Sequence, residues 1–144
     1  MQETLNIVTM VLDDDMMILE LVKASLEENG IDNYKLFYSD ADFIGELSDN
    51  MHILVIDHHL NGAADGLDVM KAAIKKNPSV FAIAMSGNYD SRIVVEYLNA
   101  GCNRFILKNE DNYLDQLIKF VREGIARFVQ DLEFFRRQET LLNA

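Results

Sequence analysis

The sequence predicts an α/β protein with a doubly wound parallel sheet of five strands and helices on both of its faces. Short apolar runs alternate with helical patterns five times along the chain. The third run, residues 53–56, is apolar throughout, as expected for a strand that is covered on both sides. The 144 residues include one proline and no linker rich in glycine, proline or serine, so one core is expected.

The first two strands and helices are expected within residues 7–48. The apolar run 7–12 predicts a strand that ends at three aspartates. Asp15 can cap a helix to about residue 29, because apolar side chains recur there at helical spacing, and Gly30 ends it. Residues 34–38 predict the second strand, after which Ser39 or Asp40 can cap a short helix to about residue 48.

The remaining elements follow in the same alternation. The third strand, 53–56, precedes a helix over 66–76 that Asn77 and Pro78 end. Residues 80–85 predict the fourth strand, and a helix over 90–100 ends before Gly101. Residues 104–107 predict the fifth strand, and a long helix begins near Tyr113.

Polar side chains follow four of the expected strands. Asp13 and Asp14 follow the first, Asp57 the third, Ser86 the fourth and Lys108 the fifth. The carboxyl ends of parallel strands share one edge of the sheet, where ligands bind in such folds. We therefore expect these five residues to come together.

This set of residues suits phosphate chemistry with a divalent metal. Two carboxylates about 4 Å apart repel by roughly 4 kcal/mol at an effective dielectric constant near 20, and a divalent cation removes that cost. An all-oxygen site favours Mg²⁺, with Mn²⁺ also suitable, over zinc. The lysine and the serine can bind phosphate oxygens, and an aspartate can itself become an aspartyl phosphate.

The pattern resembles a response-regulator receiver domain of two-component signalling, like that of chemotaxis regulators. The resemblance covers residues 6–127 and rests on four segments: VLDDD, LVID followed by ADGLDVM, AMSG, and AGCNRFILK. It implies a flavodoxin-like sheet with strand order 2-1-3-4-5. It also implies a phosphorelay module that is no enzyme, apart from its own aspartyl phosphorylation and autodephosphorylation.

The resemblance implies a role for each matching residue of the acidic site. Asp57 would be the phosphoacceptor. Asp13, Asp14 and Asp57 would hold Mg²⁺ together with the backbone carbonyl of His59, and Lys108 would pair with a phosphoryl oxygen. The imidazoles of the adjacent histidines in IDHHLNG, which alone could suggest a zinc or manganese site, would then not be ligands.

The resemblance also implies a switch. The hydroxyl of Ser86 would move to the phosphoryl group, and the aromatic ring of Phe105 would turn inward. His59 and Asn88 would occupy positions that tune the dephosphorylation rate. His58 and His52 are expected on the surface or in packing.

Two segments depart from the family pattern. The loop after Asp57 reads LNGAADG, with no proline and one extra residue. Lys108 is followed by Asn109, where the family has a proline after a cis bond. A cis bond before a residue other than proline costs about 2.5–4 kcal/mol, so a trans or distorted loop is open here.

The last helix is longer than a receiver needs. A heptad-like seam runs along it, broken by Glu139, through Ile118, Val121, Ile125, Phe128, Leu132, Phe135 and Leu142. We divide the chain into a receiver, 1–127, and a helical extension, 128–144, that would project roughly 25 Å. We predict that this extension forms a homodimer through Phe128, Leu132 and Phe135. The alternatives are a helix that folds back on the domain and a helix that leads to an absent output domain. Gly124 indicates a bend or a close approach.

The composition limits the partners. The net charge of −11 argues against direct nucleic-acid binding and against an anionic membrane surface. The single cysteine, Cys102, rules out an internal disulfide, and no signal peptide or membrane span is expected, which favours the cytoplasm. The expected partners are a histidine kinase or phosphotransfer protein as donor, and a downstream protein or an absent output domain as target.

Two other functions compete with the phosphorylated switch. A degenerate receiver could serve only as a dimerisation scaffold, an alternative that the altered loops after Asp57 and Lys108 keep open. A phosphatase of the haloacid-dehalogenase type also uses an aspartyl phosphate, but it requires a second aspartate two residues after the nucleophile. His59 stands at that position.

Overall fold

Five parallel strands form a single sheet in the computed structural model, which describes residues 6–62 and 64–143. The order is β2-β1-β3-β4-β5, and each neighbouring pair is parallel. The prediction of a doubly wound sheet in the order 2-1-3-4-5 is confirmed. The strands are β1 (Thr9–Leu12), β2 (Tyr34–Phe37), β3 (Ile53–Asp57), β4 (Phe81–Ser86) and β5 (Arg104–Leu107).

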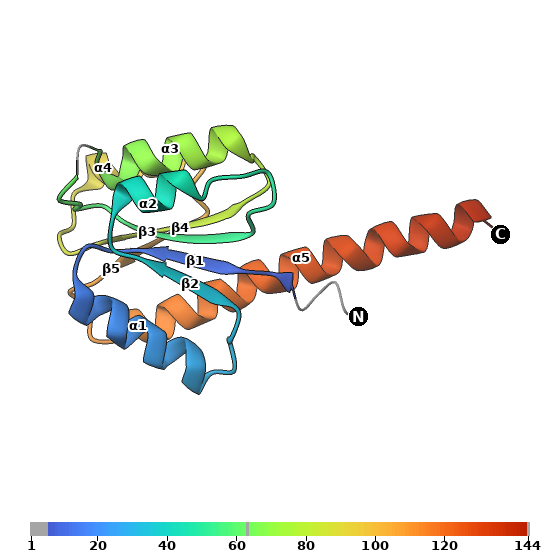
Figure 1. The fold of residues 1–144 in the computed structure, drawn as a ribbon, viewed down its shortest axis with the longest axis horizontal. Helices are drawn as coiled ribbons and strands as arrows, with labels where there is room; N and C mark the ends of the chain where they lie inside the picture. Colours follow the sequence, from blue (N-terminus) through green and yellow to red (C-terminus); the bar gives the residue numbers. More distant parts are fainter. Residues whose placement is uncertain (1–5, 63, 144) are drawn as a thin grey trace.

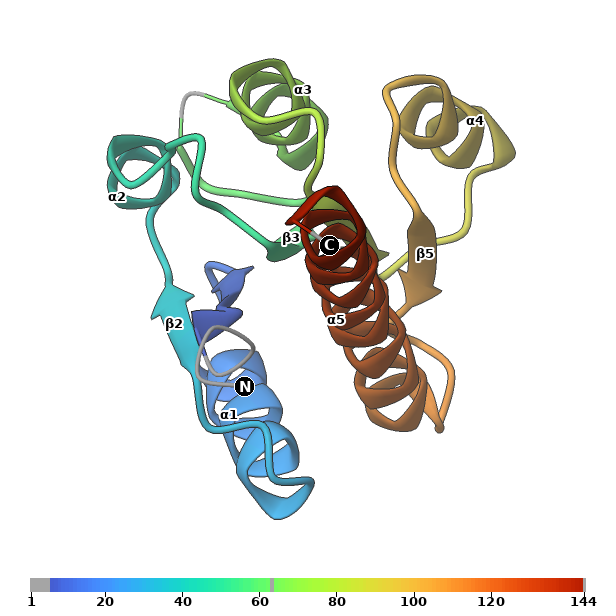
Figure 2. The same ribbon diagram turned by 90° about the vertical axis from the view of Figure 1, so that its right-hand side faces the viewer.

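Helices cover both faces of the sheet. Helices α1 and α5 lie on one face, and α2, α3 and α4 lie on the other (Figures 1 and 2). This arrangement buries both faces, so every residue of β3 and β4 is buried. The helices are α1 (Met16–Glu28), α2 (Asp40–Gly45), α3 (Gly66–Lys76), α4 (Ser91–Asn99) and α5 (Tyr113–Asn143).

Side-chain caps begin the first four helices. The carboxylate of Asp15 accepts from two backbone N–H groups of α1, Ser39 caps α2, and Asp65 forms a capping box at α3. Asp90 caps α4 by accepting from the N–H of Arg92. The predicted start of each of these helices is therefore close to the observed one.

The predicted boundaries differ from the structure at a few ends. Strand β1 begins at Thr9 rather than at residue 7, because the N–H of Val8 donates to Nδ1 of His52 (3.3 Å) instead of to a neighbouring strand. Helix α2 ends at Gly45 rather than near residue 48, because the following turn tightens into bonds from Glu46 N to Phe43 O and from residue 47 to residue 44. Strand β4 lies one residue later than predicted, so Ser86 is its last residue.

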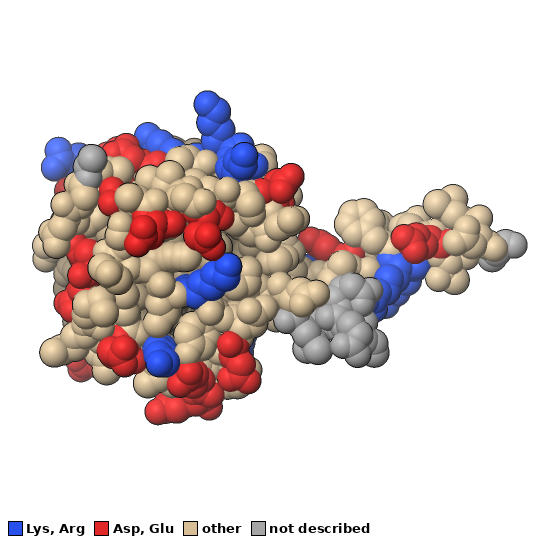
Figure 3. Space-filling view, viewed as in Figure 1, with Lys and Arg blue, Asp and Glu red and all other residues tan. Residues whose placement is uncertain are grey.

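Helix α5 is continuous over 31 residues and has two different halves. Its first half packs on the sheet, where Gly124 is buried and a Cβ on it would lie 2.9 Å from the ring of Phe81 and 3.0 Å from Ile53. The glycine therefore marks a close approach, one of the two alternatives that the sequence left open. The second half leaves the domain and projects from it (Figures 1 and 3).

The projecting half carries exposed apolar side chains. Phe128, where the helix leaves the sheet, still packs edge-on against the ring of His52, with ring centroids 5.1 Å apart. Beyond it, the large apolar side chains that are exposed are Phe134, Phe135, Leu141 and Leu142. Among the described helices, none combines the length and the apolar character needed to cross a membrane.

Candidate functional site

Three aspartates meet at the carboxyl edge of the sheet. Strands β1 and β3 are neighbours, with Leu12 opposite Ile56, so Asp13 after β1 and Asp57 at the end of β3 come side by side. Carboxylate oxygens of Asp13, Asp14 and Asp57 all lie within 4.8 Å of one another. Asp13 is 0% exposed and Asp57 is 2% exposed, so their charges are held away from water.

Lys108 is the cation of this acidic site. Its Nζ lies 2.8 Å from Oδ1 of Asp57 and 3.1 Å from Oδ2 of Asp13. The contact with Asp57 lacks the alignment of a hydrogen bond, and no other described group donates to this buried Oδ1. Three carboxylates thus cluster beside one ammonium group, which contacts two of them, and a buried carboxylate oxygen is without a hydrogen bond. This donor set fits a hard divalent cation such as Mg²⁺.

Burial dominates the electrostatics of the site. It raises the pKa of the Asp57 carboxyl to about 6; the Asp13 carboxylate adds to this rise, and Lys108 opposes it. Burial also raises the pKa of Asp13. Two contacts oppose this rise: the N–H of Asp15, which donates to Oδ1 of Asp13 at 2.9 Å, and the positive charge of Lys108. Burial alone would lower the pKa of Lys108, but its contacts with Asp57 and Asp13 outweigh that effect and raise it. The site is therefore short of positive charge.

Ser86 lies beside the acidic site because of the strand register. Asp57 pairs with Met85, and the N–H of Lys108 donates to the carbonyl of Ser86 at 2.8 Å. The Ser86 hydroxyl is buried; it donates to the carbonyl of Asn88 (3.0 Å) and accepts from the N–H of Asn88 (3.3 Å). The described residues contain no cis peptide bond, so the bond between Lys108 and Asn109 is trans.

Phe105 contacts a residue that the sequence did not point to. The half-buried ring of Phe105 packs edge-on against Tyr97 of α4, with centroids 5.5 Å apart and an interplanar angle of 70°. The hydroxyl of Tyr97 bonds Nδ1 of His58 at 2.8 Å. The sequence contains one signal for Tyr97, its position on the buried face of α4. That position indicates only a core aromatic residue and not this hydrogen bond.

The two adjacent histidines lie outside the group of potential metal-binding side chains. Within the described residues, that group consists of the three aspartates alone. His58 is half-buried and bonded to Tyr97, which is a packing role, whereas His59 is exposed. A part for the His59 carbonyl in metal binding stays a prediction.

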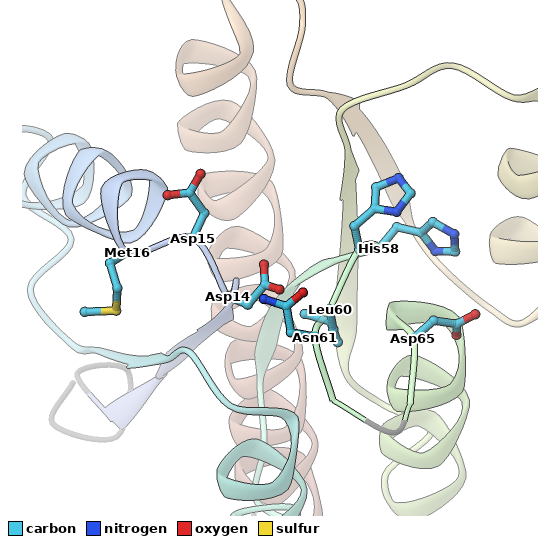
Figure 4. A pocket seen from close by; sticks show the side chains of 8 residues that line it. Asp14, Asp15, Met16, His58, Leu60, Asn61 and Asp65 are labelled. Atoms are coloured by element: carbon cyan, nitrogen blue, oxygen red, sulfur yellow. The ribbon is translucent and has the colours of Figure 1, made fainter.

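An open depression lies beside the acidic site. Asp14, Asp15 and Met16 approach it from the end of β1 and the start of α1, and His58, Leu60, Asn61 and Asp65 approach it from the segment between β3 and α3 (Figure 4). This edge of the sheet is therefore open to solvent.

Asp40 of α2 anchors the longer loop that follows Asp57. Oδ2 of Asp40 accepts from the N–H of Ala64 at 3.3 Å. A Cβ on Gly62 would run into the Asp40 carboxylate, so this loop passes directly over the side chain. The departure from the family pattern in LNGAADG is thus accommodated by a contact with α2, which the sequence did not indicate.

Comparisons with known proteins identify the family and the fold. The family model of the response regulator receiver domain matches residues 9–122. No curated protein matches the chain. The receiver domain of Francisella response regulator 1452 is similar over 85% of this chain and 99% of its own, with 26% identity and a TM-score of 0.75.

Two further solved structures share the fold. A CheY-like receiver domain protein of Methanospirillum hungatei JF-1 matches 86% of this chain and 97% of its own, with 21% identity and a TM-score of 0.75. Response regulator DrrB of Thermotoga maritima, an OmpR/PhoB homologue, matches 83% of this chain with 22% identity and a TM-score of 0.72. The match covers only 52% of DrrB, so the present chain corresponds to about half of that protein.

Proposed function

Because the chain belongs to the response regulator receiver domain family, we propose that Asp57 accepts a phosphoryl group from a histidine kinase or phosphotransfer protein. The observation that carries this proposal is the acidic site, where three carboxylates cluster beside one lysine and a buried oxygen of Asp57 has no aligned hydrogen bond. A carboxylate placed in this way can bind a cation through one oxygen and act as a nucleophile through the other.

The proposed metal is Mg²⁺, with Mn²⁺ as an alternative. Asp13, Asp14 and Asp57 would hold it together with the carbonyl of His59. When bound, the ion would supply positive charge that neutralises the transferring group and favours the ionised form of the Asp57 carboxylate.

The chain's own residues perform the transfer. A carboxylate oxygen of Asp57 forms a bond to phosphorus while the bond from phosphorus to the donor's imidazole nitrogen breaks, and the nitrogen keeps the electron pair. Lys108 already lies 2.8 Å from Oδ1 of Asp57, within reach of a new phosphoryl oxygen. The Ser86 hydroxyl turns from the Asn88 carbonyl, which it now contacts at 3.0 Å, toward the phosphoryl group. His59 and Asn88 tune the subsequent hydrolysis.

The switch acts on the surface formed by α4, β5 and α5. As Ser86 moves, Phe105 turns inward, and the surface changes shape for a downstream protein or for an output domain outside this chain. To shift the two states from 1:99 to 99:1, phosphorylation must favour the active state by about 5.5 kcal/mol.

We further propose that residues 128–144 form a dimerisation helix beyond the receiver, 1–127. The exposed apolar residues of the projecting half support this, since Phe135 is 64% exposed and Leu142 is 85% exposed. A second copy would cover the seam at Phe128, Leu132 and Phe135. The degenerate-scaffold alternative keeps this dimer but omits phosphorylation. With a net charge of −11, no contact with nucleic acid is proposed, and the cytoplasm is the proposed location.

Intact-mass spectrometry after treatment with acetyl phosphate tests the phosphoacceptor. One phosphoryl adduct is expected in the presence of Mg²⁺, with none in EDTA and none in Asp57→Ala. An adduct that persists in Asp57→Ala would refute the assignment. No adduct with acetyl phosphate or with a panel of kinases would favour the scaffold.

A further inference from the structure

Tyr97 has the largest fully buried side chain among the described residues. A phenol hydroxyl inside a protein requires a hydrogen-bond partner, because an unbonded one costs about 1–3 kcal/mol. The partner here is Nδ1 of His58, at 2.8 Å. His58 directly follows the proposed phosphoacceptor, so a residue of α4 is bonded to the segment that leaves the acidic site.

This hydrogen bond is one of three that fix His58. The N–H of His58 donates to the carbonyl of Met85 at 2.8 Å, and its carbonyl accepts from the N–H of Gly66 at 3.0 Å. A Cβ on Gly66 would lie 2.6 Å from the Tyr97 hydroxyl and 2.7 Å from Cα of His58, and it would also run into the carbonyl of Asp57. The Tyr97 hydroxyl therefore lies against Gly66 at the end of the loop and bonds the side chain of His58 at its start.

The ring of Tyr97 also connects this segment to β5. It packs edge-on against Phe105 with centroids 5.5 Å apart, and against the ring of His58 with centroids 5.5 Å apart. Tyr97 thus lies between the proposed switch aromatic, Phe105, and the segment that contains His58 and His59. Phe105 has no hydroxyl, so within this trio of side chains only Tyr97 and His58 can bond to each other.

We propose that Tyr97 is a positioning residue that couples α4 to the metal site. Its hydroxyl holds His58, and His58 holds the backbone that carries the carbonyl of His59 toward the cation. Coupling of this kind is reciprocal: what displaces Tyr97 weakens metal binding, and metal binding stabilises the position of α4. The inference rests on the proposed function, because it assigns a regulator to the same acidic site.

Tyr97→Phe tests the coupling, because it removes the hydroxyl and leaves the ring against Phe105. We expect the Mg²⁺ dissociation constant of the unphosphorylated protein, measured by calorimetric titration, to rise roughly 3- to 10-fold, the equivalent of one hydrogen bond. The rate of phosphorylation by acetyl phosphate should fall at low Mg²⁺ and return to the wild-type value at saturating Mg²⁺. A purely structural role would lower the thermal midpoint without changing the Mg²⁺ dissociation constant.

Two further variants identify the route of the effect. Tyr38→Phe removes a hydroxyl from a tyrosine that is 62% exposed, and it should leave the Mg²⁺ dissociation constant unchanged. In a His58→Phe background, which lacks Nδ1, Tyr97→Phe should have no additional effect on that constant. An undiminished effect of Tyr97→Phe in that background would overturn the route through His58.

A measurement on the unsubstituted protein covers the case in which Tyr97→Phe does not fold. Saturation with Mg²⁺ should shift the amide NMR signals of α4 around Tyr97 as well as those of residues 57–60. Signals of α4 that stay unchanged would overturn the coupling. If the wild-type protein binds Mg²⁺ and Tyr97→Phe binds it equally well, the coupling alone fails. A wild-type protein that neither binds Mg²⁺ nor accepts phosphate refutes the proposed function, and the coupling with it.

Discussion

Neutralising Asp57 should stabilise the protein in the absence of metal. Burial raises the pKa of Asp57 from 3.8 to about 6. At 1.36 kcal/mol per pKa unit, keeping this carboxylate ionised at pH 7.5 lowers the free energy of unfolding by about 3 kcal/mol. Asp57→Asn preserves the shape of the side chain and removes the charge. We therefore expect the variant to be more stable than the wild-type protein by about 3 kcal/mol at pH 7.5 in EDTA.

The pH dependence follows from the direction of the shift. Because the folded state raises the pKa of Asp57, the folded protein binds a proton more tightly than the unfolded chain does. The contribution of Asp57 to stability is therefore largest below pH 4 and is lost as the pH rises through about 6. The advantage of Asp57→Asn should shrink to about half at pH 5 and nearly disappear at pH 4.

Urea denaturation followed by circular dichroism at pH 7.5, 5 and 4 measures these differences. Asp32→Asn is the matched control, since Asp32 is exposed and the same chemical change there should leave the stability nearly unchanged. Addition of Mg²⁺ at one hundred times its dissociation constant should stabilise the wild-type protein by about 2.7 kcal/mol. The same addition should stabilise Asp57→Asn much less, because the variant lacks one of the carboxylates. An Asp57→Asn variant that is no more stable than the wild-type protein at pH 7.5 would refute the reasoning.

Three further predictions concern the sheet's amino edge and α5. Burial lowers the pKa of His52, whose Nδ1 accepts from the N–H of Val8 at 3.3 Å. The contribution of His52 to stability is therefore present above about pH 6.5 and is lost as the pH falls. His52→Leu should remove this loss of stability from a urea denaturation series between pH 7.5 and 5. Gly124→Ala should destabilise the protein by about 1–3 kcal/mol in urea denaturation despite the better helix former, because its Cβ would lie 2.9 Å from Phe81; a stabilised variant would contradict the close packing. Deletion of the residues after Arg127 should convert a dimer into a monomer in light scattering, and an unchanged mass would exclude the dimer helix.

The residues of the acidic site could be predicted because each lies at or just after the carboxyl end of a strand. Parallel strands place their carboxyl ends at one edge whatever the intervening sequence is, so Asp13, Asp57 and Lys108 could be brought together from the strand pattern alone. The structure places Nζ of Lys108 2.8 and 3.1 Å from the two carboxylates. Asn109 stands where the family has proline, and Lys108 nevertheless reaches both carboxylates.

The contacts of Tyr97 and Asp40 could not be predicted in the same way. Each depends on the packing of a helix against a loop that is distant in sequence: Tyr97 bonds a residue 39 positions away, and Asp40 one 24 positions away. Hydrophobic periodicity assigns a side chain to the buried face of a helix, but it does not specify which polar atom the side chain meets there. Similarly, Gly124 indicated a special position, and only the packing of Phe81 and Ile53 shows that it is a close approach.

The charge imbalance at Asp57 cannot itself supply the free energy of the proposed switch. Burial of the ionised carboxylate costs the metal-free folded state about 3 kcal/mol relative to the unfolded chain, whereas a complete switch requires about 5.5 kcal/mol between two folded states. A cation that relieves the imbalance equally in both states shifts neither of them. The proposed switch therefore depends on contacts that only the phosphorylated site can make, with Lys108 and with the Ser86 hydroxyl. Since Asn88 holds that hydroxyl in the structure, the proposed switch requires its release from both hydrogen bonds.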